Sequence, residues 1–312
     1  MSTEIKSPLS GIIPPLVTPL LGNDTLDVAS LENLIEHLIA GGVHGLFILG
    51  TTGEEQSLSY RLRKEVIAET CRINAGRLPV LVCITDTSLI ESAALAAYAA
   101  DHGASAVVSA APYYFAPGQP ELVEFYQELL SHLPLPLFLY NMPSHVKVNF
   151  APDTIRRIAE SGNVIGFKDS SANIPYFQSV KYAMKDHPEF SLLMGPEEVT
   201  GECVLLGANG GINGGANMFP ELYVAMYNAA RAGNVAEVCR LQQIIMQISS
   251  TIYTVGKHGS SYLKGLKCAC SLLGVIKDDF VAAPYRKFNE PERLKIREAL
   301  DALPVKDGKI IL

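Results

Sequence analysis

Short apolar runs alternate with longer amphipathic segments along most of this chain, and the alternation limits the folds it can adopt. Eight of the apolar runs have the length and content of buried strands: 11–17, 43–49, 79–84, 104–110, 136–140, 163–168, 190–194 and 209–213. Between them, apolar side chains recur at helical spacing, as at Leu31, Leu34, Ile35 and Leu38. Successive strand–helix units of this number predict an α/β fold, the (β/α)8 TIM barrel.

The 312 residues exceed the ~250 that such a barrel typically needs. We expect residues 8–233 to form the barrel and residues 234–312 to form a C-terminal helical extension packed on it, because amphipathic runs occupy 235–253 and 262–274. No linker or low-complexity tract indicates a separate domain. A doubly wound sheet would use the same units, but no G-x-G-x-x-G follows the first strand, which favours the barrel.

Composition excludes several classes of protein. The net charge of -7 and the lack of a basic run argue against nucleic acid as a partner. No apolar run reaches the ~18 residues of a membrane span, and the first residues have no signal-peptide pattern, so we expect a cytoplasmic protein. The six cysteines form no C-x-x-C and the seven histidines are scattered. Cys268 and Cys270 could supply half of a metal site, but nothing nearby completes it, so we predict no metal and no other cofactor.

Four of the predicted strands end in polar or reactive residues. Lys168 closes one run, and the segments 50–54 (GTTGE), 111–115 (APYYF) and 140–144 (YNMPS) follow three others. Each segment alone is typical of a loop. The carboxyl ends of barrel strands, however, meet at one face, where active sites lie. We therefore expect these four segments to form one site.

The position of Lys168 at the end of an apolar run needs an explanation, because lysine is rarely buried without a partner. Burial disfavours an ammonium, and a neutral amine near pH 7 can attack a ketone to form a Schiff base. The structural alternative is that the side chain reaches solvent and pairs with Asp169.

Two other strand ends offer matching chemistry. Tyr140 could relay protons to and from a carbinolamine, or could be a core aromatic with a bonded hydroxyl. Thr51, Thr52 and Gly53 offer hydroxyls and backbone N–H groups that suit a carboxylate. The alternative for this loop is a strand-to-helix turn with a threonine or serine cap.

In this order, GTTGE, PYY, YNMPS and G-x-K closely resemble the dihydrodipicolinate synthase/N-acetylneuraminate lyase family of Schiff-base aldolases, over roughly residues 11–300. The resemblance implies that pyruvate, or the pyruvyl end of a 2-keto acid, binds covalently to Lys168. It implies that Tyr140 transfers protons and that the Thr51 and Thr52 hydroxyls bind the carboxylate.

The same resemblance extends to residues that the strand ends do not reveal. It implies that Tyr114 enters a neighbouring subunit's site, where Thr51 connects it to the Tyr140 phenol. The protein would then be a homo-oligomer, a dimer of dimers. Backbone carbonyls of Gly195 and Ile212 would lie at the mouth of the barrel.

The second substrate is predicted from three residues. Synthases of the family that condense pyruvate with aspartate semialdehyde usually carry arginine where this chain has His145, and histidine is neutral much of the time at pH 7. Glu197 and Glu198 align with acidic residues that sialate lyases use on a polyol tail, although they could simply be acids at a helix N-terminus. We therefore predict cleavage or dehydration of a hydroxylated 2-keto acid, of the sialic acid or 2-keto-3-deoxy sugar acid type.

Three alternatives remain. The first is 4-hydroxy-tetrahydrodipicolinate (dihydrodipicolinate) synthase, which condenses pyruvate with aspartate semialdehyde. The second is a barrel that binds a keto acid without catalysis, which the lysine and tyrosine argue against. The third is a phosphate site at the glycine-rich segment 207–215, which no basic residue accompanies.

Overall fold

The computed structural model describes residues 5–306 and 309–311. A parallel sheet of eight strands runs in the order β1-β10-β9-β8-β7-β6-β5-β4. Its members are β1 (Gly11–Ile12), β4 (Leu46–Ile48), β5 (Val80–Cys83), β6 (Ala106–Ala110), β7 (Leu137–Asn141), β8 (Val164–Asp169), β9 (Ser191–Met194) and β10 (Gly210–Gly211). A parallel bridge between Pro15 and Phe47 closes the sheet, so the predicted TIM barrel is confirmed.

The first strand is shorter than its apolar run predicts. Pro14 and Pro15 have no N–H group, so they cannot donate to a neighbouring strand. The Pro14 carbonyl still accepts from the Phe47 N–H at 3.0 Å, which continues the barrel wall beyond β1. A small hairpin that the sequence analysis did not predict follows, formed by β2 (Leu20–Gly22) and β3 (Thr25–Leu26).

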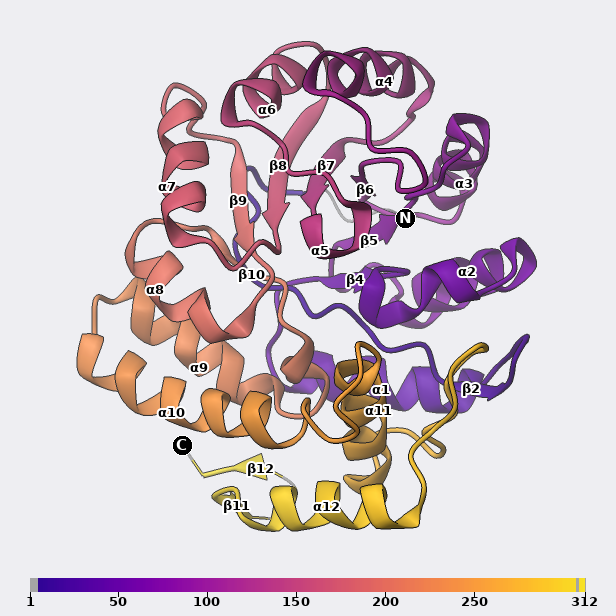
Figure 1. Cartoon of the computed structure of the whole chain (residues 1–312), viewed down its shortest axis with the longest axis vertical. Helices are drawn as coiled ribbons and strands as arrows, with labels where there is room; N and C mark the ends of the chain where they lie inside the picture. The colour runs from indigo at the N-terminus through magenta and orange to yellow at the C-terminus, as the bar shows by residue number, and fades with distance from the viewer. Residues whose placement is uncertain (1–4, 307–308, 312) are drawn as a thin grey trace.

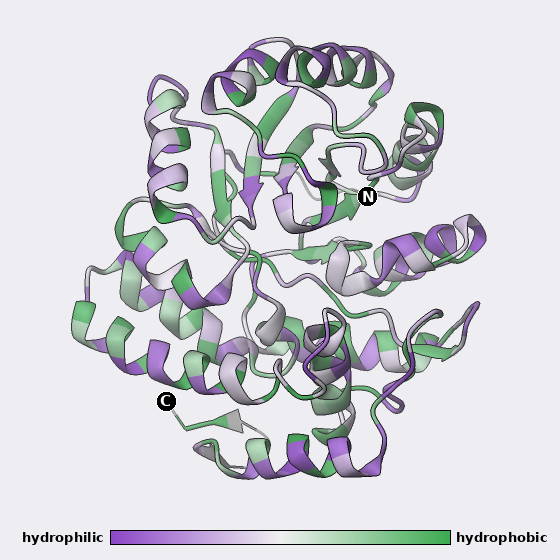
Figure 2. Ribbon diagram, in the orientation of Figure 1, coloured by the Kyte–Doolittle hydropathy of each residue, from purple (hydrophilic) through white to green (hydrophobic). Residues whose placement is uncertain are grey.

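Helices surround the barrel (Figure 1). After the strands come α1 (Val28–Ala40), α2 (Tyr60–Asn74), α3 (Leu89–Asp101), α4 (Gln119–His132), α5 (Pro143–Val146), α6 (Pro152–Ala159), α7 (Ile174–Ala183), α8 (Thr200–Leu205) and α9 (Pro220–Arg231). The side chains of Asp27 and Ser59 cap α1 and α2. The strands are mainly apolar and the outer helices carry most of the hydrophilic residues (Figure 2), because both faces of a barrel sheet are covered.

The C-terminal part contributes α10 (Val235–Thr251), α11 (Ser261–Leu272) and α12 (Glu290–Asp301), which gather along one side of the barrel (Figure 1). A short hairpin of β11 (Val305–Lys306) and β12 (Lys309–Ile310) follows. The helices fit the predicted extension, but the boundary at residues 233 and 234 stays a prediction. No helix among the described residues is long and apolar enough to cross a membrane.

A buried ion pair joins α11 to the loop after β4. The Lys267 ammonium donates to Glu54 Oε1 at 2.6 Å and to the Thr18 carbonyl at 2.8 Å, and the Ala282 N–H donates to Glu54 Oε2 at 2.8 Å. Lys267 is fully buried, and a buried charge is tolerated only when it is paired and hydrogen-bonded. The extension therefore holds the chain directly after Thr51, Thr52 and Gly53 in place.

Candidate active site

A cavity of about 570 Å³ opens at the carboxyl end of the barrel strands. Its wall includes most of the residues that the sequence analysis selected: Thr51, Thr52, Tyr140, His145, Lys168, Gly195, Glu197, Glu198 and Ile212. The strand ends therefore meet as the barrel geometry predicts. The structure shows no group of three or more histidine, cysteine or acidic side chains placed to hold a metal among the residues it describes.

Strand register places Lys168 beside Tyr140. The two residues are paired neighbours on β8 and β7, so their side chains lie on the same face of the sheet. The Lys168 Nζ atom is 3.9 Å from the Tyr140 ring centroid and 4.8 Å from that of Phe47. Lys168 is only 4% exposed. The buried amine thus lines the cavity and lies close to two aromatic rings.

Asp169 does not pair with this amine. It is the next residue of β8, so its side chain points to the opposite face. Its Oδ1 accepts from the Asn141 amide at 3.0 Å and from the Ser171 N–H at 3.0 Å, and its Oδ2 accepts from the Ser171 hydroxyl at 2.9 Å. Burial raises the pKa of Asp169. The ion pair between Lys168 and Asp169, which was the alternative explanation for the lysine, is therefore not formed.

The loop after β4 brings its two threonines to the cavity in different ways. The Thr51 hydroxyl lies 3.4 Å from the Tyr140 phenol oxygen, at the long end of hydrogen-bond distances. The Thr52 hydroxyl lies 3.1 Å from the phenol oxygen of Tyr262. Gly53 lies behind them: its N–H donates to the Gly50 carbonyl, and it is not among the residues that line the cavity. Its backbone N–H is consequently committed to the turn rather than to a substrate.

Tyr114 is not among the residues that line the cavity. It is 77% exposed in the loop after β6, and its ring packs edge-on against Phe115, which is 82% exposed. Tyr113 instead lines the cavity. Tyr114 and Phe115 thus form an exposed aromatic pair on the protein surface.

His145 lies at the mouth, on the short helix α5. Partial burial lowers its pKa, so the imidazole is neutral at pH 7. Its Nδ1 lies 2.9 Å from the Ser144 hydroxyl, which restricts the ring orientation. Gly195 and Ile212 also line the mouth, and the Gly195 carbonyl already accepts from the Asn213 amide at 3.0 Å.

Glu197 is buried and fully bonded. Its Oε1 accepts from the Tyr223 and Tyr253 hydroxyls at 2.6 and 2.8 Å, and its Oε2 accepts from the Gly215 N–H at 2.8 Å. Burial, with a further effect of Glu198, raises its pKa to about 7. These three donors leave Glu197 little capacity to bind substrate hydroxyls. Glu198 is half-buried and lines the cavity, so it remains the better candidate for that role.

Several cavity residues were missed by the sequence analysis. Tyr253 and Tyr262 come from the C-terminal extension, and their rings pack edge-on with centroids 4.8 Å apart. Glu55 and Cys83 line the side of the cavity nearest α2. No motif indicates these residues. The only indication in the sequence is that phenol and carboxyl groups within apolar segments need polar partners when they are buried.

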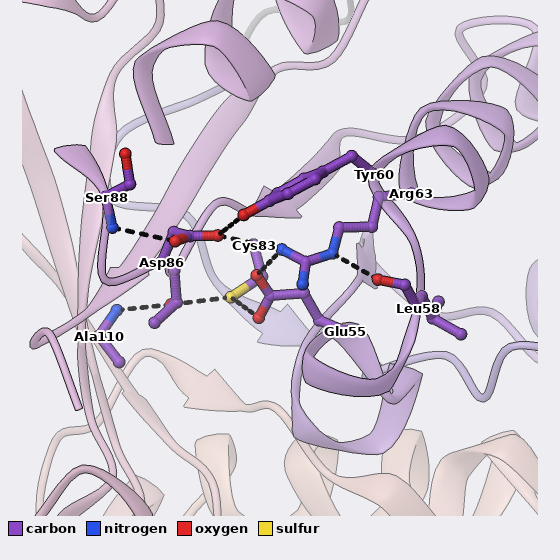
Figure 3. Close-up of polar contacts among 9 residues, drawn as sticks. Glu55, Leu58, Tyr60, Arg63, Cys83, Asp86, Ser88 and Ala110 are labelled. Atoms are coloured by element: carbon purple, nitrogen blue, oxygen red, sulfur yellow. Dashed lines mark hydrogen bonds and ion pairs between the residues drawn. The ribbon is translucent and has the colours of Figure 1, made fainter. Parts of the chain in front are cut away.

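A charged cluster lies behind this side of the cavity (Figure 3). The Arg63 guanidinium approaches Glu55 at 3.1 Å and Asp86 at 3.5 Å, and the Tyr60 hydroxyl donates to Asp86 at 2.9 Å. Glu55, Arg63 and Asp86 are buried. One guanidinium thus faces two carboxyl groups. Burial raises the pKa of Glu55 to about 8, with Asp86 adding to it and Arg63 opposing it.

Comparison with known proteins identifies the class of enzyme. The model of the dihydrodipicolinate synthetase family matches residues 8–303. This chain belongs to that family, whose members are pyruvate-dependent lyases and aldolases that act through a Schiff base, and it is an enzyme of that kind. The resemblance found in the sequence is thereby confirmed.

Individual relatives differ in their reported reactions. The chain is 31% identical to the probable 2-dehydro-3-deoxy-D-pentonate aldolase YjhH of Escherichia coli (strain K12), over 95% of this chain and 99% of that protein. A structure of dihydrodipicolinate synthase from the commensal bacterium Bacteroides thetaiotaomicron is 72% identical, with a TM-score of 0.94 over 96% of this chain and all of that one. The pyruvate complex of YagE from Escherichia coli K12 is 29% identical, with a TM-score of 0.89 over 95% of this chain and 98% of that one.

The raised pKa of Glu55 predicts a pH-dependent stability. Below pH 8 the folded protein holds a proton on Glu55, whereas the unfolded chain releases it above about pH 4.3. Stability from this group is therefore lost as the pH rises from about 5 to 8. Glu55→Gln mimics the protonated acid, so its free energy of unfolding should increase relative to wild type across that range.

Urea denaturation of both proteins at a series of pH values measures this difference. Glu91→Gln, at an exposed glutamate of α3, is the matched control and should follow the wild-type pH profile. A difference between Glu55→Gln and wild type that stays constant with pH would show that Glu55 titrates normally.

Proposed function

We propose that Lys168 is the nucleophile that forms a Schiff base with C2 of pyruvate. The observation that carries this proposal is the position of its amine, which is 3.9 Å from the Tyr140 ring centroid, on a buried side chain that lines the cavity. The amine adds to the ketone, and the carbinolamine loses water to give an iminium ion. Loss of a proton from the C3 methyl group then gives an enamine, whose C3 atom attacks an aldehyde.

Tyr140 and Thr51 are proposed to move the protons. The Tyr140 ring lies 3.9 Å from the Lys168 amine, and the Thr51 hydroxyl lies 3.4 Å from the phenol oxygen. The phenol would donate a proton to the departing water of the carbinolamine and to the new alkoxide. The Thr51 and Thr52 hydroxyls would donate to the pyruvate carboxylate, and the carbonyls of Gly195 and Ile212 would face the mouth.

For the second substrate we propose aspartate semialdehyde, so that the reaction is the condensation catalysed by dihydrodipicolinate synthase. The 72% identity to a protein described as that synthase supports this reaction. The engagement of Glu197 by Tyr223, Tyr253 and Gly215 weakens the case for polyol recognition, on which our sequence-based preference for cleavage partly depended.

Cleavage of a 2-keto-3-deoxy sugar acid is the second candidate, because the mouth of the cavity favours uncharged groups. Lys168 is the only lysine or arginine among the described residues that line the cavity, and His145 is neutral at pH 7. A second carboxylate would therefore lack the bidentate partner that arginine supplies. The 31% identity to a probable sugar-acid aldolase agrees with this candidate.

Covalent trapping tests the Schiff base. Incubation with pyruvate and borohydride should add one reduced pyruvyl group to Lys168, located by peptide mass spectrometry. Lys168→Met should abolish both labelling and turnover while preserving the fold, since it keeps the length of the stem. Lys185→Met is the control, because Lys185 also lies over a tyrosine ring, at 4.7 Å from Tyr182, but away from the cavity. Labelling of a different lysine would refute the proposal.

Parallel assays identify the second substrate. We expect condensation of pyruvate with aspartate semialdehyde to proceed faster than release of pyruvate from 2-keto-3-deoxy sugar acids or from sialic acid. His145→Arg should then improve use of the semialdehyde about tenfold, because a charged hydrogen bond contributes roughly 1.5 to 3 kcal/mol. Efficient pyruvate release from a sugar acid, without condensation, would instead establish the second candidate.

We also propose that Tyr114 completes the site of a neighbouring subunit, within a dimer of dimers. Its 77% exposure and its position outside its own cavity support this arrangement. Lys168→Met and Tyr114→Phe subunits should each be inactive or weakly active alone. When the two variants are mixed after mild dissociation, half of the randomly formed pairs contain one subunit of each kind. In such a pair the Tyr114→Phe subunit keeps Lys168 and receives Tyr114 from its partner, so one site of two is intact and about a quarter of wild-type activity should return.

Sedimentation of the mixture confirms that the subunits have reassembled. A fully active monomer, or reassembled mixed dimers without recovered activity, would show that Tyr114 does not act across subunits.

A further inference from the structure

Tyr262 places its hydroxyl against the residue proposed to bind the substrate carboxylate. Its phenol oxygen lies 3.1 Å from Thr52 Oγ1, and both side chains line the cavity. Thr52 is only 4% exposed, so its hydroxyl must find its partners within the site. Tyr262 lies in the first turn of α11, far from Thr52 in the sequence, and is not part of any strand-end segment.

Two neighbouring features hold this phenol in place. A methyl group built on Gly214 would lie 1.8 Å from the Tyr262 oxygen, so glycine at this position makes room for the hydroxyl. On its other side the ring packs edge-on against Tyr253, which is itself held by its 2.8 Å hydrogen bond to Glu197. Gly215 makes room for Tyr223 in the same way, also at 1.8 Å. The glycine pair of the segment 207–215 is thus explained by two tyrosine hydroxyls.

The direction of the Tyr262–Thr52 hydrogen bond matters for binding. A threonine hydroxyl has one hydrogen to donate and can also accept. When Tyr262 donates to Thr52, the threonine hydrogen is free to point into the cavity. In the opposite arrangement, Thr52 would present only lone pairs to the cavity, and a carboxylate would be repelled. Burial raises the pKa of Tyr262, so its hydroxyl keeps its proton and remains a donor.

We propose that Tyr262 is a positioning residue that orients the Thr52 hydroxyl toward the carboxylate of the bound 2-keto acid. This inference rests on the proposed function, in which Thr52 binds that carboxylate. Tyr262 acts through Thr52 and takes no part in the covalent chemistry at Lys168. It therefore governs the affinity for 2-keto acids and their selection over neutral ketones.

Borohydride trapping at Lys168 tests the proposal without knowledge of the second substrate. Tyr262→Phe should raise the pyruvate concentration that gives half-maximal trapping about five- to tenfold, the effect of one lost hydrogen bond to an anion-binding group. The maximal extent of trapping should be unchanged. With methyl pyruvate, which has an ester in place of the carboxylate, the same variant should behave as wild type.

Further variants separate positioning from general damage. Tyr262→Phe added to Thr52→Val should have no additional effect, because the threonine hydroxyl is already absent. Gly214→Ala, which displaces the phenol, should reproduce the selective loss for pyruvate. Tyr176→Phe removes a hydroxyl that donates to the Phe150 carbonyl, outside the cavity lining, and should leave pyruvate trapping unchanged.

The outcomes are distinguishable. If the wild-type protein is trapped at Lys168 and Tyr262→Phe is trapped at the same pyruvate concentration, Tyr262 has no such role, although the Schiff base is intact. The same conclusion follows if Tyr262→Phe loses as much affinity for methyl pyruvate as for pyruvate. Absence of trapping in the wild-type protein overturns the proposed function and this inference together.

Discussion

The parallel register between β7 and β8 is the constraint on which the site depends. Because Tyr140 pairs with Lys168, the phenol and the amine lie on the same face, and Phe47 of β4 covers the amine from across the barrel. A shift of β8 by one residue would turn the Lys168 side chain to the opposite face and bring Asp169 inward. Backbone hydrogen bonds along several strands oppose such a shift. The relative position of the amine and the phenol is thus set by the barrel sheet.

The loop after β4 depends on the C-terminal helices. Glu54 has a left-handed backbone, with φ of 60°, which is uncommon for a residue with a side chain. Its carboxylate is held by Lys267 and by the Ala282 N–H, and the preceding Thr52 is held by Tyr262. Residues beyond the eighth strand therefore support the loop that we propose binds the carboxylate. The extension forms one wall of the cavity as well as covering the barrel.

The parts of the structure that follow from a local rule can be predicted from the sequence. The apolar runs predicted every barrel strand, and the rule that active sites lie at strand ends led to Lys168, Tyr140 and Thr51 before any geometry was known. Contacts between distant segments could not be predicted. The contact of Tyr262 with Thr52 and that of Lys267 with Glu54 have no signature in either segment. Glu197 illustrates a third case. The residue lines the cavity as predicted, but its partners Tyr223 and Tyr253 change what it can do.

The central claim is that the buried amine of Lys168 bonds to pyruvate while the threonine hydroxyls hold the carboxylate. A crystal structure of the protein soaked in pyruvate tests it most directly. The account predicts continuous electron density from Lys168 Nζ to C2 of the ligand, with the carboxylate oxygens within hydrogen-bond distance of Thr51 and Thr52 and the Tyr140 phenol facing the new bond. Pyruvate bound without a covalent link, or with its carboxylate directed toward His145 and away from the threonines, would contradict it.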